Sequence, residues 1–263
     1  MRRLSIAFGT ALTIGATVAW AVTQSTAERL IAQGSEGAAR EPVVAELFTS
    51  EGCSSCPAAD DVLTRLVVSQ PIPGVEIIAL GEHVDYWDRL GWRDPFSSAG
   101  YTARQSQYGS HVFRTGNIYT PQLVIDGVTE AVGSDERRIR TLLAAAARTP
   151  KPRLTVEASL KPDGTLTASV SGAGVSASDA ELWWAITEDN LVVDVKRGEN
   201  ASRTLRHSGV VRRLSAGKVT PGINATLTLP GAANWKRENL RVVAFLQSKD
   251  TRRVLSVGFA QVF

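Results

Sequence analysis

The sequence predicts an α/β domain in residues 42–149, followed by a β-rich, sandwich-like domain in residues 153–263. Short apolar runs alternate with a helix-period pattern in the first part, whereas runs that alternate apolar and polar residues dominate the second. A proline-containing tetrapeptide at residues 149–152 separates the two sequence patterns. Of the 263 residues, 43% are hydrophobic and 21% are charged, which is typical of globular proteins and excludes disordered and polytopic membrane classes.

The N-terminal segment predicts export. Arg2 and Arg3 precede an apolar run, Leu4–Val18, and the small residues Ala19 and Ala21 form a cleavage site. We interpret residues 1–21 as a signal peptide, 22–41 as a polar linker, and the mature protein as periplasmic or secreted. The alternative is a retained membrane anchor, although the apolar run is short compared with the about 20 residues that cross a bilayer.

The first domain is expected to begin with a buried strand, Pro42–Phe48, which ends at the turn-prone residues 50–52. A helix should follow, because apolar residues recur with helical spacing from Ala59 to Val67 and Pro71 ends the pattern. The next apolar run, Val75–Leu80, predicts the second strand.

The remainder of this domain is expected to hold two helices and a hairpin. The helices are placed at about residues 99–108 and at 135–147, the latter capped by Ser134 and ended by Pro150. Residues 120–128 predict two strands around an Asp-Gly turn. The order β-α-β-α-β-β-α predicts a parallel first pair of strands and an antiparallel last pair, and it fits a thioredoxin-like sheet.

In the second domain, runs typical of strands alternate with residues that favour turns. The clearest runs are Leu154–Leu160, Thr165–Val170, Leu182–Ile186, Ala225–Leu229 and Arg241–Leu246. About seven short strands over about 110 residues are typical of a small β-sandwich.

Two cysteines, Cys53 and Cys56, lie where the first strand meets the first helix. A disulfide that closes so short a loop stabilises a fold little in the loop-closure model, so the pair indicates chemistry. At the helix N-terminus Cys53 is expected to be the nucleophile, and Cys56, one turn further, the resolving thiol. The alternatives are that the two cysteines supply half of the ligands of a metal site or form an inert disulfide.

Six motifs along the chain carry a family resemblance. They are LFTSEGCSSCPAAD (residues 47–60), HVDYWD (83–88), GWRDPF (91–96), YTPQ (119–122), RGEN (197–200) and RTL (203–205). In these motifs the chain resembles a bacterial family of exported thioredoxin-like proteins of unknown function, over roughly residues 42–263. The resemblance implies a thioredoxin-like domain and a β-rich domain, without an established substrate.

The resemblance to thioredoxins also implies roles for single residues. Thr120-Pro121 would be a cis peptide whose backbone at Thr120 pairs with an extended substrate, the alternative being an ordinary trans proline. Glu46, in an apolar strand, would be the buried acid that accepts a proton from the resolving thiol, the alternative being a structural carboxylate. Trp87 lies in a long aromatic-rich connection, which is interpreted as a substrate-binding loop or as a small separate core.

The histidines are candidates for proton relay or metal binding. His83 follows the second strand at the edge where α/β sheets place their sites, so it could assist the thiols or join them as a copper ligand, unless it only hydrogen-bonds a loop. His111 lies in a segment without an assigned element. His207 lies in the second domain, and nothing in the sequence brings it to the thiols.

The leading hypothesis is an exported thiol–disulfide oxidoreductase acting on protein or small-molecule disulfides, without an organic cofactor. Its catalytic residues would be Cys53, Cys56, Pro121 and Glu46, and Thr120 and Trp87 would contact substrate. One alternative is a copper-binding or copper-delivery module that uses Cys53, Cys56 and His83. A second is a non-catalytic thioredoxin-like interaction protein. A formal charge of +3 without aromatic stacking motifs does not indicate a nucleic-acid partner, and the sequence assigns no oligomeric state.

Overall fold

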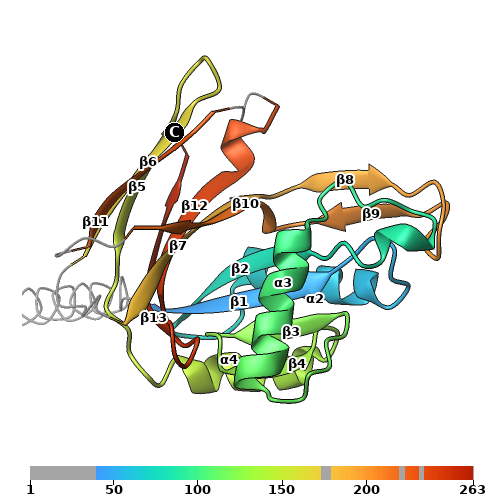
Figure 1. The fold of residues 1–263 in the computed structure, drawn as a ribbon, viewed down its shortest axis with the longest axis horizontal. Helices are drawn as coiled ribbons and strands as arrows, with labels where there is room; N and C mark the ends of the chain where they lie inside the picture. The colour runs from blue at the N-terminus through green and yellow to red at the C-terminus, as the bar shows by residue number, and fades with distance from the viewer. Residues whose placement is uncertain (1–39, 173–178, 219–222, 231–233, 263) are drawn as a thin grey trace, which may run out of the picture. The chain divides into compact units, whose positions relative to one another are not determined.

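The computed structural model describes residues 40–172, 179–218, 223–230 and 234–262, and its main element is an eight-stranded mixed sheet (Figure 1). The strands lie in the order β13 (Val254–Gln261), β12 (Leu240–Ser248), β7 (Ala180–Glu188), β10 (Val210–Gly217), β2 (Val75–His83), β1 (Glu41–Thr49), β3 (Gln122–Ile125) and β4 (Thr129–Val132). The predicted signal peptide, 1–21, and nearly all of the predicted linker, 22–41, lie outside the described residues. Among those described, no helix has both the length and the apolar character that crossing a bilayer requires.

The first half of the chain has the predicted element order. Helix α2 (Cys56–Ser69) connects β1 to β2, α3 (Ala99–Gln107) leads to the β3–β4 hairpin, and α4 (Glu136–Ala146) follows. The pair β1–β2 is parallel over its whole length, and β3–β4 is antiparallel, both as predicted. Strand β3 also pairs antiparallel with β1, which sets Gln122 opposite Phe48.

Two helix ends differ from the sequence prediction. Asp135, rather than Ser134, caps α4, because its carboxylate accepts a hydrogen bond from the Arg138 amide three residues later. Helix α3 continues into a π-helical segment, Tyr108–Val112 (η2), instead of ending near Tyr108.

The second half is β-rich, as predicted, but its strands are divided among several sheets. A three-stranded sheet contains β11 (Asn224–Leu229), β6 (Leu166–Ser171) and β5 (Thr155–Leu160), and a separate hairpin contains β8 (Leu191–Asp194) and β9 (Thr204–His207). Strands β7, β10, β12 and β13 extend the large sheet instead. Four of these elements, β8, β9, β10 and β13, were not predicted from the sequence. The predicted division of the chain at residues 149–153 stays a prediction.

Two glycines allow the halves of the large sheet to join. Strand β10 meets β2 in parallel at a single register pair, Val210 with Gly81, and the Gly81 amide donates to the Gly209 carbonyl at 2.7 Å. Gly209 has φ +68°, and a Cβ on it would lie 3.2 Å from the Cβ of Ala79. A side chain at this junction would therefore be both conformationally strained and crowded.

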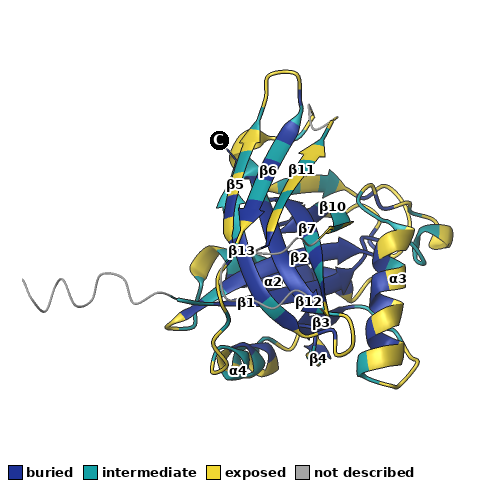
Figure 2. Cartoon of the chain, turned by 60° about the vertical axis from the view of Figure 1, so that its left-hand side comes forward, coloured by how far each residue is buried: buried dark blue, intermediate teal, exposed yellow. Residues whose placement is uncertain are grey.

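The large sheet is covered on both faces (Figure 2). On one face, α2 packs on Ala45 and Leu47, and the three-stranded sheet packs further along on Leu182 and Trp184. On the other face, Tyr101 of α3 packs with Val44 and neighbouring strand residues. Since side chains alternate along a strand, odd-numbered residues of β1 face α2 and even-numbered ones face α3.

Candidate functional site

Cys53 and Cys56 form a disulfide at the start of α2. The chain leaves β1 at Thr49, and the Cys53 amide donates to the Ser50 carbonyl at 3.2 Å in the turn before the helix. Ser55 is the N-cap residue, and Pro57 lies in the first turn, where a missing amide donor costs little. Both cysteines are buried, with 1% and 0% of their surface exposed. A reactant can therefore reach the sulfurs only after covering residues move.

The Thr120-Pro121 peptide is cis, as the resemblance implied. Trp87 links this turn to the cysteine turn, because its indole Nε1 donates to Thr120 Oγ1 at 2.8 Å. A Cβ placed on Gly52 would lie only 3.2 Å from the Cβ of Trp87. Cys53, Thr120 and Trp87, which the sequence predicted as site residues, therefore belong to neighbouring turns.

The loop between β8 and β9, residues 195–203, covers the cysteine turn. The side-chain amide of Asn200 donates to the carbonyl oxygens of Glu51 at 2.8 Å and Cys53 at 2.9 Å. Glu199 accepts a hydrogen bond from the Ser54 amide at 2.9 Å, and the Ser54 hydroxyl first, with this amide second, lowers the pKa of the Glu199 carboxyl. We call residues 195–203 the cover loop, since three hydrogen bonds tie it to residues 51–54.

Two buried histidines lie next to this turn. His83 Nδ1 is 2.7 Å from Asp94 Oδ2, and His207 Nε2 is 3.2 Å from Glu51 Oε1. The rings of His83 and His207 are 5.0 Å apart between centroids. The expectation that His207 would stay away from the thiols was wrong, because β9 packs against α2 and brings His207 to Glu51, two residues before Cys53.

The acids around these histidines are also buried. Asp60, one turn after Cys56 on α2, accepts a hydrogen bond from Thr49 at 2.9 Å, and its other oxygen lies 3.6 Å from His207 Nδ1. Burial raises the pKa of Asp60, and the opposing effect of His207 and His83 leaves it above the ordinary value. Burial by itself would raise the pKa of Asp94 too, but the contact with His83 and its hydrogen bonds bring it below the ordinary value.

The pKa of His83 determines a pH-dependent part of the stability. Burial alone would lower that pKa, but Asp94 first, and then Asp60 and Glu51, raise it from 6.5 to about 9. A raised folded-state pKa gives stability that is complete below the unfolded-state pKa of about 6.5 and is lost as the pH rises towards 9. The free-energy difference of unfolding between wild type and His83→Gln should therefore be largest below pH 6.5 and shrink by pH 9, as measured by urea denaturation.

His111→Gln is the matched control for this prediction. The His111 side chain is itself exposed, and its Nδ1 lies within hydrogen-bond distance of the Gln107 carbonyl and the Ser110 hydroxyl. A difference for His83→Gln that grows towards pH 9, or one that His111→Gln reproduces, would contradict the assigned ion pair.

Glu46 lies on the opposite face of the sheet from α2. Its carboxylate, which is fully buried, accepts hydrogen bonds from Arg104 Nε at 2.6 Å and from the Tyr108 hydroxyl at 2.6 Å. Burial acts to raise the pKa of Glu46, but the Arg104 guanidinium outweighs it, so the pKa lies below the ordinary value. The pKa of its neighbour Glu82 is well above the ordinary value, through burial first and then the charge of Glu46.

Within the described residues, no group of three or more His, Cys, Asp or Glu side chains has an arrangement that could hold a metal ion. His83 is the residue predicted as a possible copper ligand, and its Nδ1 faces Asp94. The copper alternative stays an untested prediction.

The comparison with protein families identifies the chain. A model of a family described as proteins of unknown function, DUF1223, matches residues 44–247. The chain belongs to the DUF1223 family. The expectation of a family of unknown function is thereby confirmed, and the family carries no assigned activity that could be transferred to the cysteine turn.

Solved structures add a fold comparison for this DUF1223 protein. The chain is similar to a protein from Agrobacterium tumefaciens with a crystal structure, at 26% identity over 85% of this chain and 95% of that chain, with a TM-score of 0.65. A domain of the outer membrane lipoprotein Omp28 from Porphyromonas gingivalis matches at 15% identity over 43% of this chain and 95% of that chain, with a TM-score of 0.26, which is too low for an argument. No curated protein matches the chain.

Three polar residues around the cysteine turn of this DUF1223 protein were not predicted as site residues from the sequence: Asp60, Glu199 and Asn200. A signal for each was present, because Asp60 lies in the motif of residues 47–60 and the other two lie in the motif of residues 197–200. The three residues bond to the turn or lie next to it.

Proposed function

We propose that this protein is an exported thiol–disulfide oxidoreductase with a thioredoxin-like core, acting on protein or small-molecule thiols and disulfides. The observation that carries the proposal is the Cys53–Cys56 disulfide in the first turn of α2, next to the end of β1 that pairs with the cis-Pro121 strand. The amides at a helix N-terminus stabilise a thiolate, so Cys53 is suited to leave and attack as a thiolate. The export part rests on residues 1–21.

The thioredoxin-like part of the proposal is supported by the arrangement of the first half of the chain. Strands β2, β1, β3 and β4 are neighbours in that order, with one parallel pair and two antiparallel pairs. Helices α2 and α4 pack on one face of these strands, and α3 packs on the other. This arrangement puts the cysteine pair at the carboxyl edge of the parallel strands.

The exchange reaction would conserve sulfur bonds and electrons. A substrate thiolate attacks the Cys53 sulfur, an S–S bond forms between them, and the Cys53–Cys56 bond breaks. Cys56 leaves as a thiolate and takes up a proton. A second substrate thiolate then attacks the substrate sulfur, which releases Cys53 as a thiolate. The substrate loses two electrons, the cysteine pair gains them, and the reducing direction is the reverse sequence.

Asp60 is better placed than Glu46 to exchange the proton of Cys56. It lies four residues after Cys56 on α2, hence on the same helical face, whereas Glu46 faces α3 and is held by Arg104 and Tyr108. Burial raises the pKa of Asp60 above its ordinary value, and a raised pKa makes a carboxyl group a better proton acceptor. We therefore assign the proton-transfer role, predicted for Glu46, to Asp60.

Asp60→Asn should alter the pH dependence of disulfide exchange, because the amide removes the titrating group beside the resolving thiol. The expected result is slower release of the mixed disulfide and loss of one ionisation from the pH–rate profile, measured by stopped-flow exchange with a small disulfide. Glu46→Gln is the control and should leave the profile unchanged. The opposite pattern, with the ionisation lost in Glu46→Gln, would return the role to Glu46.

The cover loop makes access to the disulfide a separate step. Because Cys53 is 1% exposed and exchange needs direct approach to a sulfur, the bonds from Glu199 and Asn200 should slow reduction. Glu199→Ala should raise the rate constant for reduction by excess dithiothreitol several-fold. The reduced fraction is measured over time by alkylating the free thiols and weighing the protein by mass spectrometry. Asn200→Ala should raise the rate constant further, since it removes two hydrogen bonds.

The control for the cover-loop variants is Glu157→Ala, which removes an exposed glutamate from β5. It should leave the reduction rate unchanged. Equal rates in wild type and Glu199→Ala, with both proteins folded, would contradict the assigned function of the cover loop.

The proposed function is tested by equilibrating the Cys53–Cys56 pair in glutathione or dithiothreitol buffers, on metal-stripped protein, and trapping the thiols by alkylation. We expect a reversible two-electron transition between roughly −120 and −270 mV, the range of exchange enzymes. A potential below about −300 mV, or a pair that does not equilibrate, would identify a structural disulfide. Stoichiometric copper binding by the reduced protein that weakens in His83→Ala would instead favour the copper alternative.

A further inference from the structure

We propose that a cavity between α3 and strands β7 and β10 binds a small organic anion with an aromatic body. The cavity has a volume of about 430 Å³, which is within the usual size of small-molecule sites. It lies on the α3 face of the large sheet, whereas the cysteine helix α2 packs on the other face. The inference does not depend on the function proposed for the cysteines.

The walls of the cavity are rich in aromatic side chains. They are Phe96, Tyr101, Trp183 and Trp235. Tyr101 is fixed by a hydrogen bond from its hydroxyl to the Val211 carbonyl at 2.8 Å. Flat rings held around a cavity of this size favour a flat, apolar ligand body that stacks against them.

The cavity carries one positive charge without an ion-pair partner among the described residues, that of Arg213. Arg104, Arg212 and Arg213 line it, and none of the described residues that line it carries a carboxylate. From outside the lining, Glu46 pairs with Arg104 at 2.6 Å and Glu188 pairs with Arg212 at 2.9 Å. The Arg212 guanidinium lies 5.2 Å from the Phe96 ring centroid and 5.3 Å from that of Trp235. Arg213 is exposed and, among the described residues, makes no ion pair within 4 Å. Positive charge beside aromatic walls favours an anionic ligand.

Two buried donors at the cavity lack a hydrogen-bond partner among the described residues. They are Nη1 of Arg104 and the indole Nε1 of Trp183. The other Arg104 nitrogens are occupied, since Nε donates to Glu46 and Nη2 to Tyr108. The Arg104 guanidinium lies 4.8 Å from the Trp183 ring centroid. An acceptor group on a ligand would satisfy donors that otherwise stay unpaired.

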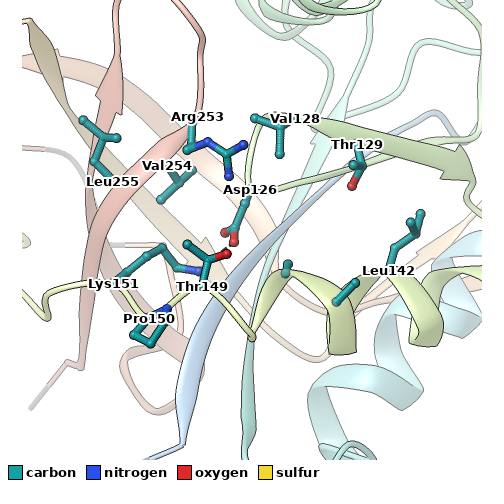
Figure 3. A pocket seen from close by; sticks show the side chains of 12 residues that line it. Asp126, Val128, Thr129, Leu142, Thr149, Pro150, Lys151, Arg253, Val254 and Leu255 are labelled. Atoms are coloured by element: carbon teal, nitrogen blue, oxygen red, sulfur yellow. Dashed lines mark hydrogen bonds and ion pairs between the residues drawn. The ribbon is translucent and has the colours of Figure 1, made fainter.

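A second cavity, of about 350 Å³, lacks these features (Figure 3). It lies at the opposite end of β1 from the cysteines, has no aromatic side chain among the described residues that line it, and contains a carboxylate, Asp126, whose Oδ2 is 2.7 Å from Lys151 Nζ. Its lining residue Arg253 therefore provides a matched control for an arginine of the proposed site.

The test is calorimetric titration of the purified chain with naphthoate and with its neutral analogue naphthamide. We expect saturable one-to-one binding of naphthoate, and a dissociation constant at least about tenfold weaker for naphthamide. Arg213→Gln and Trp183→Phe should each weaken naphthoate binding at least about tenfold, whereas Arg253→Gln should not. Trp183→Phe keeps one aromatic ring in place while removing the indole N–H and its second ring, and Arg213 is exposed, so both variants are expected to fold.

Three outcomes would overturn the proposal. The first is absence of saturable naphthoate binding at millimolar concentration. The second is equal affinity for naphthamide, which would show that the arginines do not select an anion. The third is binding that Arg253→Gln weakens while Arg213→Gln and Trp183→Phe leave it unchanged, which would place the ligand in the other cavity.

Discussion

Cys53→Ser should reduce thiol–disulfide exchange to the uncatalysed background, whereas Cys56→Ser should accumulate a mixed disulfide with the substrate. The two sulfurs differ in position, because Cys53 precedes α2 and Cys56 is its first residue. Without Cys53 there is no thiolate at the helix N-terminus to form the mixed disulfide. Without Cys56 the mixed disulfide forms but has no neighbouring thiol to resolve it.

Exchange with glutathione disulfide, followed by non-reducing mass measurement, distinguishes these two results. Ser69→Ala is the matched control on the same helix, because Ser69 is exposed at the far end of α2 and its hydroxyl donates to the Arg65 carbonyl. It should retain wild-type turnover. A Cys53→Ser protein that still turns over would contradict the mechanism, and so would a Cys56→Ser protein in which no mixed disulfide accumulates.

The sequence predicted the elements that carry strong local patterns. Strand β1 is a mostly apolar run, helix α2 has a clear helical period of apolar residues, and the Asp-Gly turn identified the β3–β4 hairpin. The short strands β8 and β9, at four residues each, carry too little pattern to be distinguished from loops. Strand β10 was missed because its path depends on Gly209 and Gly81, which meet at a separation of well over a hundred residues.

The candidate site was predictable to a similar extent. The cysteine pair and the position of His83 follow from local motifs, and the resemblance to thioredoxins implied the cis peptide at Pro121. The contacts of Asn200 with Cys53 join residues 147 positions apart, and no local pattern reports such a pairing. Because side chains alternate along β1, the sequence predicts that Glu46 points to the opposite face of the sheet from Ala45 and Leu47. It does not predict which of the two faces α2 covers.

Arg104 is a buried cation whose removal should destabilise the protein strongly. It is 3% exposed, and it bonds Glu46 at 2.6 Å and the Tyr108 hydroxyl at 3.0 Å. Arg104→Leu would leave the Glu46 carboxylate buried without its counter-charge, and removing one partner of a buried ion pair costs about 3–5 kcal/mol. Urea denaturation should show a loss of this size in the free energy of unfolding.

Arg65→Leu is the control for that measurement. Arg65 pairs with Glu136 at 2.8 Å, but its side chain is 54% exposed, and exposed pairs contribute about 0–1 kcal/mol. The double variant Glu46→Leu, Arg104→Leu should recover part of the loss, because both buried charges are then absent. If Arg104→Leu costs no more than Arg65→Leu, the Glu46 carboxylate is not held by this ion pair, and its assignment as a structural rather than a proton-transferring group fails.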